Sequence, residues 1–428
     1  MAHLNKAGWE NVTDAKFADL IIVNSCGFIE SAKQESINAV IEWRKLYPNK
    51  KILLAGCLSQ RYEKELSGEL TEADGFFGVE ALEQITQKAE LICNDDPAQR
   101  QINPKVRSTD DKEKIITGER PLLSLPGSAY VKISEGCNNN CSYCAIPLIR
   151  GGLVCRSIPD IVDECRLLLK RGIKELCLIG QDIGAYTNGL VNLLKAIAEI
   201  DENFWVRLLY IHPDHFPMEA LDLMESDKRF LPYFDIPFQH ASAKILKLMN
   251  RNKKQHEEIN EDAFHRYLEL INTIRGRLSQ AIIRSTFLLG FPGETDKDFS
   301  ALLDFQKEAR LDWLGCFTYS REEGTESFTM KARVPAKIAA LRKQTIEEAQ
   351  VSITEKSMDR FAGLTLDVLI EEQVDDFFLG RLYCQAPDID GAAVITGCDT
   401  NAIKPKLGSL VPCKVIARRG FDLEVIIV

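Results

Sequence analysis

Residues 130–144 read YVKISEGCNNNCSYC, a strand-like run that leads directly into a cluster of cysteines. The run Tyr130–Ser134 has the composition of a buried strand, and three cysteines follow it at the spacing C-x3-C-x2-C. Five further strand-like runs follow, alternating with helical stretches: Glu175–Ile179, Val206–Ile211, Phe234–Phe238, Ile282–Leu289 and Leu314–Tyr319. Six strand–helix units predict an incomplete parallel (β/α)6 barrel related to the eight-unit TIM barrel. Such barrels hold their sites at the carboxyl ends of the strands, so we expect the three cysteines there.

Residues 1–94 show the same alternation in a shorter form. The strand-like runs Ala18–Asn24 and Lys51–Ala55 each precede a helix-length stretch, Glu30–Leu46 and Ser59–Leu70. Apolar runs of this kind suit strands that are buried on both faces. We therefore expect an α/β domain with a parallel sheet covered by helices.

The rest of the chain divides by composition. Residues 95–125 are polar and lack periodicity, which predicts a linker. The barrel would occupy residues 126–360. In residues 361–428, short strand-like runs are separated by Gly, Asp and Pro, a pattern typical of a small antiparallel β-barrel of about five strands.

The composition excludes several classes of protein. A chain of 428 residues with 45% hydrophobic and 27% charged residues is expected to fold into several globular domains. We find neither a signal-like leader nor an apolar run of roughly 18 residues, so we expect a cytoplasmic protein without a membrane partner. The formal net charge of −10 argues against broad electrostatic capture of nucleic acid.

The three cysteines of the opening stretch are Cys137, Cys141 and Cys144. Three thiols on one loop can converge on one site, and on a four-iron cluster they leave one iron open to a small molecule. Structural zinc sites usually take four ligands, so zinc is an alternative, as is a chance grouping of cysteines. Cys26 and Cys57 form a second pair, because each lies within two residues of the end of a predicted parallel strand. Both would lie at one edge of the sheet, as a metal site requires, with two small buried cysteines as the alternative interpretation.

The C-x3-C-x2-C loop after a barrel strand resembles the radical S-adenosylmethionine enzymes. The resemblance implies that Cys137, Cys141 and Cys144 hold a four-iron [4Fe-4S] cluster. It also implies that the amino and carboxylate groups of S-adenosylmethionine bind the open iron. An electron from the cluster would then cleave the sulfonium to methionine and a 5′-deoxyadenosyl radical.

The same resemblance implies four cofactor contacts. Tyr143 stands where the superfamily places an aromatic residue beside the adenine, and Gln181 follows the second strand, where the amino group is bound. Gly290 and Gly293 follow the fifth strand and would let the backbone approach the adenosine closely. A tight turn between strand and helix is the alternative interpretation of these two glycines.

The three-part organisation resembles the methylthiotransferases, which join an N-terminal cluster domain, a radical domain and a C-terminal TRAM barrel. The resemblance implies a second [4Fe-4S] cluster on three N-terminal cysteines. Cys26 and Cys57 match two of these, and the position of the first would fall before Met1. We therefore expect residues 1–94 to be truncated at their start and one ligand of the second cluster to be absent from this sequence.

Several stretches are similar to the ribosomal-protein branch of that family. These stretches are NSCGFIESA at residues 24–32, IPLIRG at 146–151, DIPFQHAS at 235–242 and GRLYCQAPDIDG at 380–391. The similarity implies addition of a methylthio group to the β-carbon of an aspartate in small-subunit ribosomal protein S-twelve. It also implies an electron donor such as a flavodoxin or ferredoxin.

The charge of the C-terminal segment favours the same branch. Residues 361–428 hold six Lys and Arg against ten Asp and Glu, whereas an RNA-reading barrel should carry a basic face. Asp388 and Asp390 are therefore candidate contacts to a basic protein substrate, with a solvated turn as the alternative. Two other functions stay open: a transfer-RNA adenosine methylthiotransferase, and a truncated iron–sulfur protein that cleaves S-adenosylmethionine without transferring sulfur.

Overall fold

The computed structural model describes residues 1–79, 82–94, 120–251, 253–254, 257–258, 263–375, 377–398 and 405–428. Most of the predicted linker, residues 95–119, lies outside the described residues. The chain forms two compact units. Unit 1 comprises Met1–Pro121, Gly136–Val154 and Ser320–Thr329, and unit 2 comprises Leu122–Glu135, Cys155–Tyr319 and Met330–Val428.

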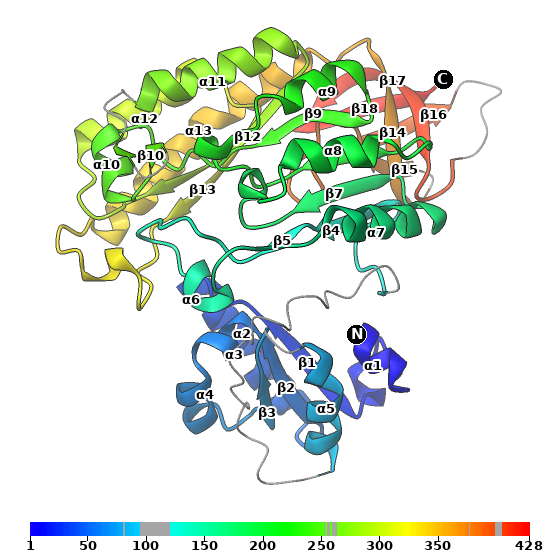
Figure 1. The fold of residues 1–428 in the computed structure, drawn as a ribbon, viewed down its shortest axis with the longest axis vertical. Helices are drawn as coiled ribbons and strands as arrows, with labels where there is room; N and C mark the ends of the chain where they lie inside the picture. The colour runs from blue at the N-terminus through cyan, green and yellow to red at the C-terminus, as the bar shows by residue number, and fades with distance from the viewer. Residues whose placement is uncertain are drawn as a thin grey trace. The chain divides into compact units, whose positions relative to one another are not determined.

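Unit 1 is built on a three-stranded parallel sheet in the order β1-β2-β3 (Figure 1). Its strands are β1 (Leu20–Ser25), β2 (Lys51–Gly56) and β3 (Gly75–Phe77). Its helices are α1 (Ala2–Lys6), α2 (Glu30–Leu46), α3 (Cys57–Arg61), α4 (Glu63–Glu69), α5 (Ile85–Cys93) and α6 (Ile146–Arg150). Alternate residues of β2 belong to different cores: Leu54 packs with residues of α2 and α4, and Leu53 packs with residues of α1 and α5. Helices on both faces explain why β2 is continuously apolar.

Unit 2 contains a six-stranded sheet in the order β13-β12-β9-β8-β7-β4, in which every neighbouring pair is parallel. Its strands are β4 (Ser128–Lys132), β7 (Glu175–Ile179), β8 (Trp205–Leu208), β9 (Phe230–Asp235), β12 (Ile282–Leu289) and β13 (Trp313–Thr318). Its main helices are α7 (Ile158–Lys170), α8 (Leu190–Ala198), α9 (Ala220–Ser226), α10 (Ala243–Leu248), α11 (Ala263–Arg277), α12 (Asp296–Ala309) and α13 (Ala336–Asp359). Spatial order follows chain order, and β4 and β13 remain as edges, which confirms the open six-unit barrel.

Short elements complete the α/β part of the chain. They are β5 (Ser134–Glu135), β6 (Val154–Cys155), β10 (Lys253–Lys254) and β11 (Glu257–Glu258). Helix α7 shows how local sequence fixes a crossover helix: the Ser157 side chain caps its start by accepting from Asp160 N, and Pro159 lies in its first turn. Its buried residues include Cys165, Leu168 and Leu169, which lie on the buried face of this amphipathic helix.

Residues after α13 form a closed barrel in the order β14-β15-β16-β18-β17. The strands are β14 (Thr365–Val374), β15 (Phe377–Arg381), β16 (Ala393–Cys398), β17 (Leu410–Arg419) and β18 (Asp422–Ile427). The small C-terminal barrel is thus confirmed, with one refinement: β16 pairs with β18 in parallel, and the other neighbouring pairs are antiparallel.

The small barrel and the six-stranded sheet share one hydrophobic core. Val368 and Val425 of the barrel belong to the same buried cluster as Trp205, Tyr233 and Trp313 of the sheet. The Trp313 indole N–H donates to the carbonyl oxygen of Cys384 at 2.8 Å, which satisfies its buried donor. The two parts of unit 2 are therefore packed as one body.

A buried ion network also joins these two parts. Glu175, at the start of β7, accepts from Arg207 Nε at 2.7 Å and from Arg381 Nη2 at 2.5 Å, and all three side chains are at most 4% exposed. Arg381 also pairs with Glu371 of β14 at 2.6 Å. Burial alone would raise the pKa of Glu175, but the two guanidinium groups outweigh it and lower this pKa to about 2. Glu175 is therefore a buried carboxylate that stays charged at neutral pH.

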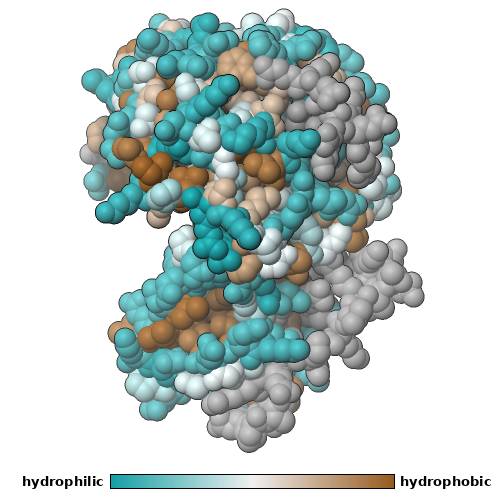
Figure 2. All heavy atoms as spheres, turned by 90° about the vertical axis from the view of Figure 1, so that its left-hand side faces the viewer, coloured by the Kyte–Doolittle hydropathy of each residue, from teal (hydrophilic) through white to brown (hydrophobic). Residues whose placement is uncertain are grey.

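One face of the molecule shows how hydrophilic and apolar side chains are distributed on the surface. Figure 2 shows one face on which hydrophilic side chains predominate and apolar ones lie in separate patches. Among the described residues, no helix combines the length and apolar character that crossing a bilayer requires.

Candidate functional site

The loop that carries Cys137, Cys141 and Cys144 belongs to unit 1 and runs into α6. All three thiols are partly exposed, and none is in a disulfide. The loop folds back on the residues after α6, because Cys137 N donates to the Gly151 carbonyl oxygen at 3.2 Å. Within the loop, Cys144 N donates to the Cys141 carbonyl oxygen at 3.0 Å. Backbone hydrogen bonds thus hold the loop in place, and its three cysteine residues are partly exposed.

The donor set of this loop fits a four-iron cluster better than a single ion. Across the described ranges, no three His, Cys, Asp or Glu side chains are gathered tightly enough to bind one metal ion. A four-iron cluster makes a different demand, because each thiolate binds its own iron and the ligands stand further apart. Three cysteines on one short loop would supply thiolates for three irons of such a cluster.

A glycine controls how this loop begins. Gly136 has φ +74°, and a Cβ at this position would collide with the carbonyl oxygens of Gly151 and Gly152. We expect Gly136→Ala to displace Cys137 and to lower the iron content after anaerobic reconstitution, since both the left-handed backbone and the backbone contact penalise a side chain. The control is Gly276→Ala in α11, where a Cβ meets nothing within 4 Å. This substitution should lower neither the stability nor the iron content. Equal iron content in the two variants would contradict this prediction.

Gln181 follows β7 in unit 2, and its side-chain oxygen is buried without a hydrogen-bond partner in the described part of the chain. The next residue fixes the turn: Asp182 Oδ1 accepts from Gly184 N and from His212 N, each at 3.2 Å. Asp182 Oδ2 lies 2.6 Å from His215 Nδ1, and this hydrogen bond raises the pKa of His215 above its ordinary value. An unsatisfied buried acceptor on a rigid turn is suited to an ammonium donor.

The end of β4 offers a second unsatisfied acceptor nearby. Ser134 Oγ is also buried without a partner among the described residues. A Cβ on Gly180 would lie 2.5 Å from Ser134 Oγ, so a side chain at this position would force the Ser134 hydroxyl to move. Together with Gln181, Ser134 gives this edge of the sheet the polar character expected of a site for the amino group of S-adenosylmethionine.

Gly290 and Gly293 form a tight turn at the end of β12. Both have positive φ, +76° and +89°, and Gly290 N donates to Glu294 Oε2 at 2.8 Å. Glu294 in turn pairs with Arg342 of α13 at 2.7 Å. The turn geometry accounts for both glycines, so their approach to adenosine stays a prediction. Tyr143 lies between Cys141 and Cys144 in unit 1 and is partly buried.

Cys26 and Cys57 lie at one edge of the unit 1 sheet, as the parallel-strand argument predicted. Each follows directly on its strand, and the last residues of β1 and β2, Ser25 and Gly56, are paired in register. Glycines allow this closeness: a Cβ on Gly56 (φ +114°) would lie 2.6 Å from Ser25 O, and one on Gly27 would lie 2.6 Å from Cys57 O. Cys26 is exposed and Cys57 is partly buried. The described residues add no third metal-ligand side chain to this pair.

Asp388 and Asp390, the two candidate substrate contacts, differ in their exposure to solvent. Asp390 has a fully buried side chain that accepts from the Tyr233 hydroxyl at 2.6 Å, from Ala386 N at 2.8 Å and from Arg284 at 2.9 Å. The expectation that Asp390 contacts substrate does not fit this burial, because its carboxylate fastens the barrel to β9 and β12. Asp388 is exposed, with φ +65°, and remains a candidate contact.

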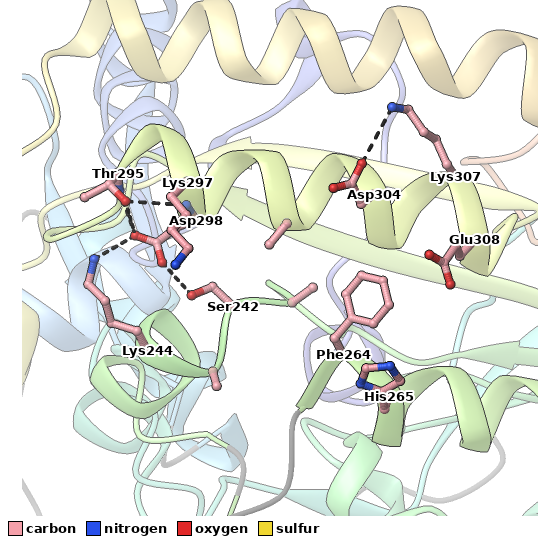
Figure 3. A pocket seen from close by; sticks show the side chains of 13 residues that line it. Ser242, Lys244, Phe264, His265, Thr295, Lys297, Asp298, Asp304, Lys307 and Glu308 are labelled. Atoms are coloured by element: carbon pink, nitrogen blue, oxygen red, sulfur yellow. Dashed lines mark hydrogen bonds and ion pairs between the residues drawn. The ribbon is translucent and has the colours of Figure 1, made fainter.

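A cavity of about 940 Å³ lies elsewhere in unit 2, among the outer helices α10, α11 and α12 (Figure 3). Its polar groups bind one another: Asp298 accepts from Ser242 at 2.6 Å, from Lys244 at 2.7 Å and from the Thr295 hydroxyl at 2.6 Å. Lys244 also donates to the Gly293 carbonyl oxygen at 2.7 Å, so the polar groups around this cavity already have partners. We therefore assign it no part in the chemistry.

Family models match three parts of the chain: the Radical SAM superfamily at residues 131–305, the uncharacterized protein family UPF0004 at 1–78 and the TRAM domain at 362–428. A solved structure of the radical S-adenosylmethionine methyltransferase TsrM from Kitasatospora setae, with cobalamin and a [4Fe-4S] cluster bound, is similar in fold. Its TM-score is 0.56 at 16% identity, over 75% of this chain and 68% of that one. The fold and the thiol loop thus define a radical S-adenosylmethionine enzyme with a TRAM barrel.

Curated relatives identify the family within the radical S-adenosylmethionine enzymes. Proteins named ribosomal protein uS12 methylthiotransferase RimO are 46% identical in Treponema denticola, 39% in Syntrophomonas wolfei and 36% in Thermotoga maritima. The alignments cover 99%, 99% and 98% of this chain and 96%, 94% and 94% of the relatives. The chain belongs to the RimO family of radical S-adenosylmethionine methylthiotransferases. This family uses S-adenosylmethionine and two [4Fe-4S] clusters.

Proposed function

We propose that this methylthiotransferase modifies ribosomal protein uS12, adding a methylthio group to the β-carbon of an aspartate. The observation that carries the proposal is the similarity to uS12 methylthiotransferases over 98–99% of the chain, with the C-x3-C-x2-C loop in place. A ribosomal-protein substrate implies that the reaction takes place in the cytoplasm. The electron donor would be a small redox protein such as a flavodoxin or ferredoxin.

We assign the following roles in cofactor binding to residues of this chain. Cys137, Cys141 and Cys144 would hold one cluster, and Cys26 and Cys57 would contribute to the second. A bound radical cluster supplies the electron that cleaves S-adenosylmethionine to the radical that attacks an unactivated carbon. Gln181 would accept a hydrogen bond from the amino group of S-adenosylmethionine, because its buried oxygen lacks another partner in the described chain. The Asp182–His215 hydrogen bond would keep that turn in place.

Product analysis tests the proposal. The full chain is reconstituted anaerobically with iron and sulfide, reduced, and incubated with S-adenosylmethionine and either uS12 or transfer RNA. We expect a methylthio group in place of hydrogen on one aspartate of uS12 and no change in transfer RNA. Modification of transfer RNA alone would overturn the substrate assignment. Release of 5′-deoxyadenosine with neither substrate modified would instead support an iron–sulfur protein that cleaves S-adenosylmethionine without transferring sulfur.

Asp388 is proposed to contact the basic uS12 surface. Asp388→Asn removes the charge and keeps a residue that tolerates positive φ, so the turn should survive. We expect KM for uS12 to rise by roughly 1.5- to 5-fold, as for other exposed charge pairs, with kcat unchanged. The rise should shrink at high salt, because exposed charges are screened.

The control for Asp388→Asn is Asp163→Asn, which removes an exposed carboxylate that pairs with Arg166 on α7. Its KM for uS12 should match that of the parent. A KM for Asp388→Asn that equals the control at low salt would remove Asp388 from the proposed interface.

A further inference from the structure

One face of the six-stranded sheet packs against the C-terminal barrel, and charged side chains continue that face toward the strand ends. Cys177, Tyr233 and Ile282 belong to the core that the sheet shares with the barrel. Because side chains alternate along a strand, the residues two positions further on point to the same side. These are Asp235 of β9 and Arg284 of β12, which are paired in register. The polar part of this face thus lies toward the carboxyl ends of the strands, where barrels of this type hold their sites.

The guanidinium group of Arg284 is fixed on one side and open on the other. Its Nη1 donates to Asp390 Oδ1 at 2.9 Å, and the Asp390 side chain is fully buried. Its Nε lies 3.8 Å from Asp235 Oδ1, which is too far for a hydrogen bond. The described residues offer no acceptor to Nη2, and the Arg284 side chain is 16% exposed. Arg284 is therefore a firmly held cation with an unused donor.

Space lies beside this unused donor. Gly315 of β13 belongs to the same face, since Trp313, two positions earlier, is part of the shared core. A Cβ on Gly315 would make only ordinary contacts, 3.6 Å from Arg284 Nη2 and 3.8 Å from Thr286 Oγ1. Crowding therefore does not require a glycine here, and the small residue leaves room beside the guanidinium for a ligand group.

Tyr210 approaches the same charges from the end of β8. It lies two positions after the strand with φ +67°, a left-handed conformation that is rare for an aromatic residue. Its N donates to Asp235 Oδ2 at 3.3 Å, and the residue is 49% exposed. Burial raises the pKa of its hydroxyl, Asp235 raises it further and Arg284 lowers it, which places the hydroxyl close to both charges. Strained backbone of this kind collects at functional sites.

The other cations on this face are not available to a ligand. Arg207 of β8 is 0% exposed, and its Nε donates to Glu175 at 2.7 Å. Lys132, the last residue of β4, pairs with Glu135 at 2.7 Å. Within the described strands of this face, Arg284 is the cation that a ligand can reach without breaking an ion pair.

The carboxylates beside Arg284 leave its charge available for one more. Asp390 takes one guanidinium nitrogen. Burial raises the pKa of Asp235 to about 6, because Arg284 at 3.8 Å offsets only part of the desolvation and Asp390 adds a like charge. An arriving carboxylate would raise this pKa further, so Asp235 would take up a proton and donate a hydrogen bond instead of repelling the ligand.

We propose that Arg284 binds the carboxylate of the aspartate that is modified, with Nη2 as the donor. The inference rests on the proposed function, in which the target is an aspartate of uS12. Moving a charged side chain out of water costs free energy unless a fixed cation receives it. The β-carbon is one bond from the carboxylate, so an ion pair with Arg284 would hold the reacting carbon in place. It would also select aspartate over a neutral residue.

A double-mutant cycle tests this inference through binding. The full chain is reconstituted anaerobically, kept unreduced with S-adenosylmethionine, and titrated with uS12 or with uS12 whose modified aspartate is replaced by asparagine. We expect the parent chain to bind the asparagine form roughly 10- to 100-fold more weakly, as for loss of a hydrogen bond to a charged group. In Arg284→Gln this preference should disappear. Arg284→Lys keeps the charge beside Asp390 but lacks a second nitrogen for the substrate, so the preference should fall several-fold.

Tyr233→Phe is the matched control for Arg284→Gln. The Tyr233 hydroxyl donates to the same Asp390 carboxylate at 2.6 Å, so both substitutions weaken the attachment of the C-terminal barrel. Tyr233→Phe leaves Arg284 in place and should keep the preference for the aspartate form. Arg284→Lys carries the test if Arg284→Gln does not fold, which thermal unfolding shows.

Three outcomes would overturn the inference. The parent chain binds both forms of uS12 equally, or the preference survives unchanged in the Arg284 variants, or Tyr233→Phe loses it to the same extent as they do. A parent chain that neither binds nor modifies uS12 would remove the proposed function, and the inference with it. A parent chain that modifies uS12 but shows no preference would overturn the inference alone.

Discussion

Replacing Cys141 by alanine should abolish the formation of 5′-deoxyadenosine. Cys141 is the middle thiol of a three-thiol loop, and its carbonyl oxygen also accepts from Cys144 N. Loss of an outer partner of a metal ligand already costs about 10- to 100-fold, so loss of a direct ligand should cost roughly 100-fold or more. The measurement is the yield of 5′-deoxyadenosine after anaerobic reconstitution and chemical reduction, together with iron per chain.

The matched control for Cys141→Ala is Cys155→Ser, which changes a partly exposed cysteine just outside the loop. Its sulfur accepts a long hydrogen bond from Thr187 N, at 3.4 Å, which a hydroxyl can replace. This control should retain both iron and cleavage of S-adenosylmethionine. Full cleavage by Cys141→Ala would refute the assignment of the radical cluster to this loop.

Replacing Glu175 by alanine should destabilise unit 2 by roughly 3–5 kcal/mol, the usual cost of removing one partner from a buried charge network. Arg207 and Arg381 would lose their shared carboxylate, and both are almost fully buried. Glu371 still pairs with Arg381, so Arg207 is left with the larger deficit. Urea unfolding followed by circular dichroism measures the change.

Asp163→Ala is the control for Glu175→Ala, because its partner Arg166 is exposed and surface substitutions usually change stability by about 0.5 kcal/mol or less. The pH dependence gives a second readout. Glu175 has its pKa lowered from 4.5 to about 2, so its contribution is complete above pH 4.5 and is lost as the pH falls toward 2. Glu175→Ala should therefore lose less stability than the parent on acidification. Equal acid sensitivity would show that Glu175 does not stay charged in the folded state.

Local sequence patterns predicted the elements whose signals are local. Helix α2 at Glu30–Leu46, strand β7 at Glu175–Ile179 and strand β12 at Ile282–Leu289 lie where composition and periodicity placed them. Strand β9 was misplaced, predicted at 234–238 and found at Phe230–Asp235, because the loop after it is equally apolar. Ile236 and Phe238 in that loop are fully buried, so hydrophobicity alone cannot mark where pairing ends.

Tertiary contacts decided the features that the sequence could not show. The stretch 59–70, predicted as one helix, breaks between α3 and α4 at Tyr62, whose ring lies beneath the Lys33 ammonium group at 5.2 Å. The parallel pairing of β16 with β18 leaves no trace in an alternating pattern. Local spacing revealed the three loop cysteines.

The same limit applies to the candidate site. The contact of Arg150 with Cys57 and the burial of Asp390 against Arg284 each join residues about a hundred positions apart. Gln181 and Ser134 show why the sequence reveals only part of a site. The sequence placed Gln181 at a strand end, but only the structure shows that both oxygens are buried without partners among the described residues.

The shared core of the sheet and the C-terminal barrel has a consequence for engineering substrate choice. Grafting a barrel from a transfer-RNA-modifying relative would require a donor that also brings the partners of Glu175 and Arg284, here Arg381 and Asp390. A chimera without them would leave Glu175 and Arg284 without these partners and would expose Trp205 and Trp313 to solvent. We expect such a chimera to be unstable and degraded, and not to act on a new substrate. We therefore expect substrate recognition in this family to change through the exposed loops of the C-terminal barrel and not through replacement of the whole barrel.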